Sequence, residues 1–512
     1  MTTAKRVIKN TGFLYIKMAV TVFISFYTTR LILNSLGASD FGIFNIVGGA
    51  IAMLGFLNST LANATQRFMS YAEGEGNLDQ KRKIFNLSFL LHFIIAIVTI
   101  VLLLFAMYPL FNGILNILPE RINAAKIVYL SLIFSTTLTI INVPYDAIMN
   151  AHENMLYYSL IGIFESILKL LVAFICVFTS HDKLVLYGLL MAIIPLVSLS
   201  IMKLYCHRNY EECIFAFRRY WDFSLIKKIA SFSGWNFLTA ISSLLSVQGV
   251  GVVLNHFWGA TLNASQGIAQ QLNGQLSAFS ANLMKAVNPV IVKNAGAKDV
   301  SRMNEMSILS CKYSTILILL FAIPFIIEIK FILRIWLTNV PDWAELFCIL
   351  QFLQTIIIQS ANAIATSIYA QGDIKGYAIY KSIMNLLPLI LTYVAFKCGG
   401  SPFWLYVPTI VVWGGGGNVV IIYYAKKKCN LCTNSYFKKA VIPICYCIAL
   451  MLLISIPIKL FLVEGIFRTF VTLILCTIVL MFSLFVFGMN NTERESFKNI
   501  LLNCIRYFTK KF

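Results

Sequence analysis

The stretch Leu33-Asn34-Ser35-Leu36-Gly37-Ala38-Ser39 recurs 222 residues downstream as Asn255-His256-Phe257-Trp258-Gly259-Ala260-Thr261. The second copy places Gly259 over Gly37 and Ala260 over Ala38. The identities are few, but the apolar segments on both sides of each copy keep the same offset. Two equivalent membrane bundles are a common transporter design, because one bundle can rock against the other around a central site. The repeat therefore predicts two equivalent six-helix bundles.

The composition is that of an integral membrane protein. Of the 512 residues, 59% are hydrophobic and 12% are charged, and the mean hydropathy is +0.79. Soluble domains carry about 25% charged residues. Apolar runs long enough to cross a ~30 Å hydrocarbon core recur along the whole chain. We therefore expect an all-α fold with about 14 transmembrane helices, at 11–33, 41–65, 85–109, 124–148, 155–179, 184–205, 232–256, 260–285, 308–331, 343–369, 374–397, 402–425, 438–459 and 464–488.

These spans divide the chain into five parts. We expect an N-terminal bundle over 1–205, a basic cytoplasmic connector over 206–230, and a C-terminal bundle over 231–425. Two extra transmembrane helices follow over 426–490. A basic cytoplasmic tail over 491–512 completes the chain and is expected to form an amphipathic surface helix.

The basic residues fix the expected orientation. One set of loops holds 29 Lys and Arg residues, and the opposite set holds 8. Cytoplasmic loops carry the excess of basic residues, so both termini are expected in the cytoplasm. Each half has an even number of spans, so the two halves share one orientation. The same rule accounts for the net charge of +20 without a nucleic-acid partner.

Metal and cofactor chemistry finds little support in the sequence. The one close cysteine pair, Cys429 and Cys432, has no second pair of Cys or His to complete a zinc site. The glycine run Gly414-Gly415-Gly416-Gly417 lacks the Lys-Ser/Thr of a phosphate-binding loop, and we interpret it as a kink or a packing point. We expect no metal, no cofactor and no catalytic residue.

A polar stripe runs along the expected eighth span. It consists of Gln266, Gln270, Asn273, Ser277 and Ser280, which share one helical face. Asn236 belongs to a similar, broader face of the seventh span. Such faces are more polar than one packing seam needs, so we expect them to line a water-filled cavity. The small-residue face of the second span is interpreted as helix packing.

Bases inside the expected spans are the second group of candidate substrate-binding residues. A charge at a helix centre costs ~2.5–3.5 kcal/mol on insertion scales, so it usually faces a cavity or a partner. Lys17 lies on the polar side of the first span, which favours a cavity over snorkelling to the surface. For Arg30 and Lys381, snorkelling explains the charge equally well.

Acids inside the spans are few. Glu165 precedes Lys169 by four residues, so the two side chains either face a cavity or neutralise each other. Asp146 lies near the inner end of the fourth span. The surplus of bases favours an anionic cargo with polar groups, such as a phosphate-linked sugar. Glu165 and Asp146 are the candidates for coupling to a cation gradient.

The stretch from Leu36 to Val47, after a first span that ends in Thr29-Arg30-Leu31, resembles the polysaccharide flippases of the multidrug/oligosaccharidyl-lipid/polysaccharide (MOP) exporter superfamily. The turn Ala370-Gln371-Gly372-Asp373-Ile374-Lys375 also looks like that family's. The resemblance implies a bacterial inner-membrane protein that moves an undecaprenyl-pyrophosphate-linked oligosaccharide, such as an O-antigen unit, across the membrane by alternating access. It implies that Lys17 and Arg30 hold the pyrophosphate. Polysaccharide assembly proteins are a further class of partner that it allows.

Three other functions stay open. A cation-coupled multidrug exporter of the same superfamily would use membrane-embedded acids, which Glu165 and Asp146 could supply. An integral-membrane glycan-processing enzyme would need catalytic groups, but the five histidines are dispersed and pair with no carboxylate in the sequence. A purely structural scaffold would not need charges deep in the membrane.

Overall fold

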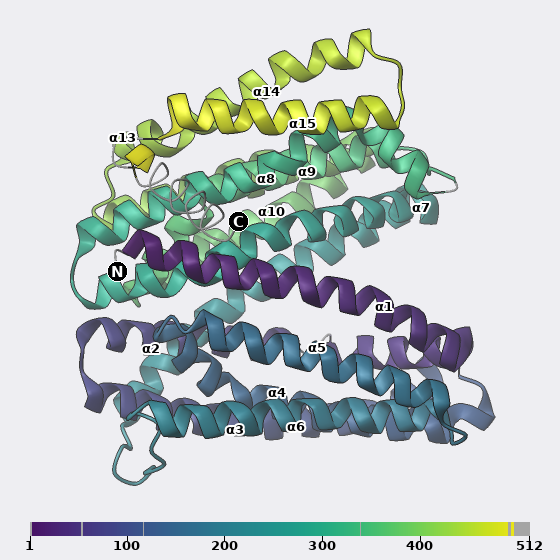
Figure 1. Cartoon of the computed structure of the whole chain (residues 1–512), viewed down its shortest axis with the longest axis vertical. Coiled ribbons are helices and arrows are strands. Elements are labelled where there is room, and N and C mark those ends of the chain that lie inside the picture. The colour runs from purple at the N-terminus through teal and green to yellow at the C-terminus, as the bar shows by residue number, and fades with distance from the viewer. Residues whose placement is uncertain (1–2, 53–54, 116, 338, 490–492, 496–512) are drawn as a thin grey trace, which may run out of the picture. The chain divides into compact units, whose positions relative to one another are not determined.

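The computed structural model describes residues 3–52, 55–115, 117–337, 339–489 and 493–495, which form helices and no strand (Figure 1). The α-helices are α1 Thr3–Ala52, α2 Gly55–Glu75, α3 Leu78–Pro109, α4 Ile122–Ala151, α5 Met155–Phe178, α6 Lys183–Asn209, α7 Phe223–Gly296, α8 Val300–Trp336, α9 Ala344–Ala370, α10 Lys375–Lys397, α11 Tyr406–Pro408, α12 Gly417–Cys429, α13 Thr433–Tyr436, α14 Ile442–Phe461 and α15 Ile466–Ser483. The short helical turns are η1 Leu110–Ile114, η2 Pro119–Arg121, η3 Pro402–Leu405, η4 Thr409–Gly416, η5 Phe437–Val441 and η6 Leu484–Gly488.

The helices begin where the sequence supplies capping side chains. Asp222 accepts a hydrogen bond from the backbone N–H of Leu225 at the start of α7, and Asp182 does the same for Leu184 at the start of α6. Such caps satisfy backbone N–H groups that have no partner inside the helix. The apolar composition of the segments that follow then favours burial in lipid or in protein.

The chain forms two compact units. Unit 1 consists of 1–241, 285–303 and 369–379, and unit 2 consists of 242–284, 304–368 and 380–512. Helix α7 contributes to both units, and unit 1 also contains the turn between α9 and α10. Short segments of the second half of the sequence therefore fold with the first half.

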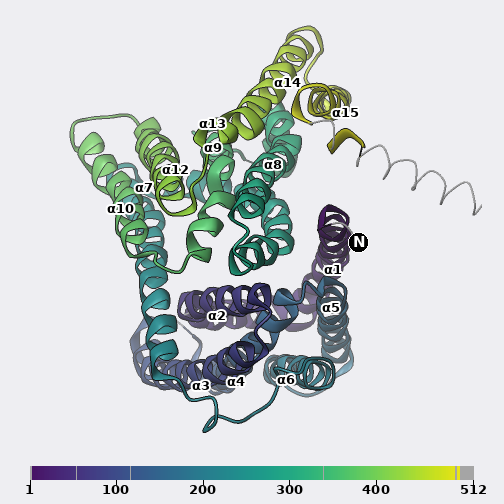
Figure 2. The same cartoon turned by 90° about the vertical axis from the view of Figure 1, so that its left-hand side faces the viewer.

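Unit 1 is built around α1 to α6. Helix α1 packs along α5, and α4 packs along α6 and α2 (Figure 2). Its core is apolar and aromatic, with Phe85, Tyr129 and Tyr145 almost fully buried. At one end, Asp40 and Asp182 both form ion pairs with Arg121. Asp40 belongs to the stretch that resembles the flippases, and in this structure it joins α1 to the start of α4.

Unit 2 contains most of α8 and α9 and all of α12, α14 and α15. Its core includes Leu319 of α8, Phe347 of α9 and Met451 of α14. Arg468 of α15 forms a buried ion pair with Glu328 of α8, with 2.7 Å between Nη2 and Oε2. A buried pair of this kind fixes the position of the last helices, because either charge alone would be costly in a membrane.

Twelve helices in the described residues are long and apolar enough to cross a membrane. The expected spans 41–65 and 260–285 are not among them. The first is divided between the short apolar helix Ser39–Ile51 and α2, and the second is the polar part of α7. The all-α membrane fold is thus confirmed, while the count of 14 stays a prediction. Of the tail expected over 491–512, only 493–495 lie among the described residues.

The sequence repeat has a direct counterpart in the backbone. Gly37 breaks α1 at φ 77° and ψ 167°, and Gly259 breaks α7 at φ 78° and ψ −176°. This region of backbone space is almost exclusive to glycine. The two residues that the alignment of the repeats pairs with each other therefore have the same special conformation.

A second pair of glycines forms a reciprocal contact inside unit 1. A Cβ on Gly74 of α2 would overlap the carbonyl oxygen of Lys293 in α7. A Cβ on Gly296 of α7 would overlap the carbonyl oxygen of Tyr71 in α2. Under the 222-residue offset, Tyr71 corresponds to Lys293 and Gly74 to Gly296. The ends of α2 and α7 thus approach each other in a symmetric way, and glycine permits that approach.

Candidate functional site

Each unit contains a polar cavity lined by residues of its own. The cavity of unit 1, called the charged cavity, has a volume of about 340 Å³. Helices α1, α4, α5 and α6 supply its walls. It brings together four of the candidates that the sequence analysis selected, namely Lys17, Asp146, Glu165 and Lys169. These four residues belong to three helices, α1, α4 and α5, so their proximity depends on the packing of unit 1.

Lys17 is held where α1 crosses α5. Its aliphatic chain lies against Gly162, and a Cβ on Gly162 would overlap it. Its Nζ lies 4.1 Å from the ring centroid of Tyr158, a cation–π distance. Lys17 is therefore anchored inside unit 1 and lines the charged cavity, as the sequence analysis expected.

Lys285 approaches the same aromatic ring. Its Nζ lies 3.7 Å from the ring centroid of Tyr158, and it interacts electrostatically with Asp146. Lys285 is the last residue of the expected span 260–285, and the sequence analysis did not select it as a candidate. Two ammonium groups on one tyrosine ring give this part of unit 1 a strong positive field.

Glu165 and Lys169 do not neutralise each other in this structure. Among the described residues, no ion pair within 4.0 Å joins them, although both line the charged cavity. Glu165 instead adds its negative field to that of Asp146. Of the two alternatives left open by the sequence, the structure thus favours cavity-facing side chains.

The cavity of unit 2, called the amide cavity, has a volume of about 380 Å³. The stripe of the expected eighth span lines one side of it through Gln266, Gln270, Asn273 and Ser277. At these four residues the helical face that the sequence predicts does border a cavity, and their role in binding a substrate stays a prediction. Ser280, the last residue of the stripe, is buried and lies outside the cavity lining.

Helix α9 supplies the opposite wall of the amide cavity. Its contribution is Gln351, Gln354, Thr355 and Gln359, and Thr355 donates a hydrogen bond of 2.6 Å to the amide oxygen of Asn273. The rings of Tyr406 and Trp413 complete the lining. The sequence analysis missed the glutamines of α9, although their spacing within an apolar span places them on one helical face.

Three candidates lie outside both cavities. Arg30 is exposed on α1, and Asn236 is buried in α7. Lys381 of α10 lies against Gly417, where a Cβ would overlap its Nζ. A Cβ on Gly414 would lie 3.2 Å from the side chain of Ile357, and a Cβ on Gly416 would lie 3.0 Å from that of Met384. The glycine run is therefore a packing surface, and Lys381 lies on it.

Comparison with known proteins gives the fold. No family model matches the chain, and no curated protein has a significantly similar sequence. Solved structures of MATE transporters do match. MATE in the bent conformation is 14% identical, with a TM-score of 0.68, over 84% of this chain and 97% of that chain. An outward-facing multidrug resistance MATE family transporter of the MOP superfamily is 13% identical, with a TM-score of 0.66, over 83% and 94%.

A third solved structure belongs to a transporter with a different pocket. It is a MOP superfamily transporter from Pyrococcus furiosus in which the reversed polarity of the binding pocket suggests a different function. It is 14% identical to this chain, with a TM-score of 0.65, over 85% of this chain and 96% of that chain. These likenesses extend over most of both chains in each comparison. The chain is therefore a multi-pass helical protein with the fold of the MATE transporters.

Proposed function

We propose that this chain is a membrane transporter, not an enzyme, and that it moves a lipid-linked oligosaccharide across the membrane by alternating access. The amide cavity is the observation that carries this proposal. Carboxamides both donate and accept hydrogen bonds, which matches the hydroxyl groups of a sugar. The rings of Tyr406 and Trp413 offer apolar faces beside these amides. A cavity with this lining suits a neutral polyhydroxylated cargo.

The charged cavity suits the phosphate part of the same cargo. Lys17 and Lys169 line it, and Lys285 lies against Tyr158 in its wall. Their ammonium groups bind phosphate oxygens as point charges. The acids Asp146 and Glu165 weaken this field, and they are the groups that could take up a proton or a sodium ion during the cycle. No covalent step is needed, because the energy of transport would come from such a gradient or from consumption of the cargo on the far side.

A cation-coupled multidrug exporter is the second candidate. Two acids share the charged cavity, and a cavity with acids attracts cationic drugs. The similarity of fold favours this candidate more than the first, since the neighbours include a multidrug resistance transporter. The chemistry of the amide cavity favours the first.

Transport by the purified protein in liposomes separates the two candidates. One assay follows the movement of a fluorescent polyprenyl-pyrophosphate-linked oligosaccharide between leaflets, and the other follows efflux of a cationic dye driven by an imposed proton or sodium gradient. The flippase proposal predicts translocation of the lipid-linked sugar and little dye efflux. Dye efflux with no lipid-linked sugar movement would reject it in favour of the exporter.

Variants of the amide cavity test whether transport of the lipid-linked sugar depends on this cavity. Gln270→Ala and Gln354→Ala each remove amide groups from the cavity wall, and we expect the pair to slow sugar transport roughly tenfold. Gln248→Ala is the matched control, because Gln248 is exposed on the same helix as Gln270 and outside the cavity lining. Equal losses in the control and in the pair would argue against a sugar site.

A further inference from the structure

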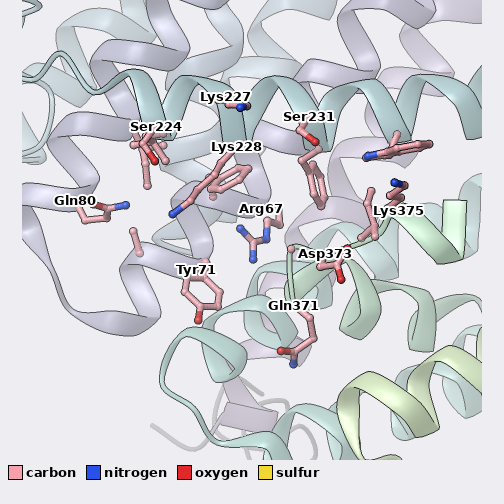
Figure 3. A pocket seen from close by; sticks show the side chains of 18 of the residues that line it. Arg67, Tyr71, Gln80, Ser224, Lys227, Lys228, Ser231, Gln371, Asp373 and Lys375 are labelled. Atoms are coloured by element: carbon pink, nitrogen blue, oxygen red, sulfur yellow. The ribbon is translucent and has the colours of Figure 1, made fainter.

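Unit 1 contains a third polar concavity, the basic pocket, which lies apart from the two cavities described above. Its volume is about 750 Å³. The C-terminal part of α2, the first turns of α7 and the turn before α10 form its walls. Four bases line it, namely Arg67, Lys227, Lys228 and Lys375, against the two acids Glu75 and Asp373 (Figure 3).

Arg67 forms the rigid floor of the basic pocket. Its Nε and Nη2 donate hydrogen bonds to the carbonyl oxygens of Tyr369 and Ala370, at 3.2 Å and 2.5 Å. Its guanidinium also lies 4.5 Å from the ring centroid of Phe68 and 4.8 Å from that of Tyr71. These contacts hold the side chain in place, and Nη1 donates no hydrogen bond to any residue that the structure describes, so a fixed positive charge faces the pocket.

The lysines of the pocket carry no compensating ion pair. Lys227, Lys228 and Lys375 are exposed, and none of them has a carboxylate within 4.0 Å in the part of the chain that the structure describes. The Nζ of Lys375 lies 5.8 Å from the ring centroid of Trp235. A concave surface with several uncompensated bases attracts anions.

Part of the wall between the bases is apolar, and the rest carries the polar side chains of Gln80, Ser224, Ser231 and Gln371. Phe68, Ile84, Leu225 and Phe232 contribute to the apolar part, together with the ring of Trp235. An inorganic anion would use only the charges, whereas an amphiphile with a phosphate headgroup would use both kinds of wall. The pocket also lies on the side of the chain that the distribution of basic residues predicts to face the cytoplasm, where anionic lipids are abundant.

We propose that the basic pocket is a binding site for a phosphate-bearing headgroup attached to an apolar chain. Arg67 and Lys228 bind the phosphate oxygens, Lys375 closes the opposite side, and the aromatic wall around Phe232 receives the first part of the chain. The phosphate belongs either to a membrane phospholipid or to a polyprenyl phosphate. This proposal does not depend on the cargo, and it holds for a flippase and for a drug exporter alike.

Binding to the purified full-length protein tests the proposal. The probes are dihexanoylphosphatidylglycerol and farnesyl pyrophosphate, both short enough to be titrated calorimetrically in a mild detergent. Lys227→Gln with Lys228→Gln should weaken binding of the recognised probe roughly 30-fold, and Lys375→Gln roughly fivefold. Recognition of the first probe assigns a phospholipid site, and recognition of the second assigns a polyprenyl phosphate site.

A second lysine pair provides the matched control. Lys426 and Lys427 are adjacent and exposed at the end of α12, and they line no pocket described here. Their double replacement by Gln removes the same charge without touching the basic pocket, so binding should change less than about twofold. The proposal is overturned if neither probe binds, or if both double variants lose affinity equally, because the charges would then act only through the general field of the protein.

Discussion

Gly37 and Gly259 lie 222 residues apart and have nearly the same backbone conformation, with φ of 77° and 78°. Each interrupts a long helix, so that the helix is divided at equivalent points of the two halves. This correspondence is stronger support for the repeat than the few identical residues around the glycines. It also shows that the repeat preserves a backbone requirement more strictly than it preserves side chains.

Replacement of these glycines should be costly. An alanine at Gly37 or Gly259 would have to adopt a backbone region that is almost exclusive to glycine, at a cost of about 1–3 kcal/mol. We expect a lower thermal unfolding midpoint in detergent for Gly37→Ala and for Gly259→Ala. Gly12→Ala is the control, because Gly12 is helical in α1 and has no atom within 4 Å of its Cβ position. Equal midpoints for all three variants would contradict this interpretation.

The close approach of α2 and α7 predicts that larger residues at Gly74 and Gly296 lower the stability of the protein. Gly74→Ala and Gly296→Ala would each push a methyl group into backbone atoms of the other helix, which typically costs about 1–3 kcal/mol. Gly234→Ala in α7 meets no atom within 4 Å, and it should be neutral or slightly stabilising, since alanine favours helix over glycine. Thermal unfolding of the three variants measures the difference. A stable Gly74→Ala protein would mean that the helices separate easily.

The hydrogen bond between His152 and Glu212 predicts a pH dependence of stability. Burial raises the pKa of Glu212. The hydrogen bond from His152, with 2.5 Å between Nε2 and Oε1, lowers it, as do several smaller contributions. Together they outweigh burial, so the pKa of Glu212 lies below the usual 4.5. A carboxyl group with a lowered pKa stabilises the fold above pH 4.5, and this contribution is lost as the pH falls through the lowered value.

Glu212→Gln isolates this contribution. At pH 6 to 7, the variant should be less stable than the wild type by about 1.5–3 kcal/mol, because a hydrogen bond to a charged group is lost. The difference in unfolding midpoint should shrink as the pH falls below about 4.5, where the wild-type carboxylate becomes protonated. A difference that stays constant down to pH 3 would show that the charge of Glu212 does not stabilise the fold.

Lys17 and Arg30 should behave differently, although both are bases of α1. Lys17 lines the charged cavity and lies 4.1 Å from the ring centroid of Tyr158, whereas Arg30 is exposed and outside the cavity. We expect Lys17→Gln to reduce transport in liposomes roughly tenfold or more, since a charge-assisted contact with the cargo is lost. Arg30→Gln should keep most of the activity. Normal elution in size-exclusion chromatography would show that both variants fold.

The helical periodicity of the sequence predicted the wall of the amide cavity that α7 supplies. Gln266, Gln270 and Asn273 form a regular pattern within one apolar segment, and such a pattern is visible in a single sequence. The opposite wall was not predicted, although Gln351, Gln354 and Thr355 of α9 recur at i, i+3 and i+4 on one helical face. Their facing partners lie about 80 residues away, and nothing in a periodic pattern identifies the helix that it faces.

The charged residues show the same limit. The sequence identified Lys17 and Asp146 as candidates. It did not select Lys285, the last residue of the expected span 260–285. Lys285 meets Tyr158 because α5 and α7 approach each other in unit 1, a tertiary contact that hydropathy does not predict. Helix α7 also continues for three turns beyond the expected end of that span, to Gly296. Span boundaries chosen from hydropathy are least reliable where a helix becomes polar.

Accessibility of position 270 to water from both sides of the membrane tests the central claim of alternating access most directly. Gln270→Cys would be labelled with a membrane-impermeant thiol reagent in a variant without the native cysteines, in oriented vesicles, with and without lipid-linked oligosaccharide. Alternating access predicts that the reagent labels position 270 from either side of the membrane. The ratio of labelling from the two sides should change when the lipid-linked oligosaccharide is added. Failure of the reagent to reach position 270 from either side, in a protein that is folded, would contradict the account.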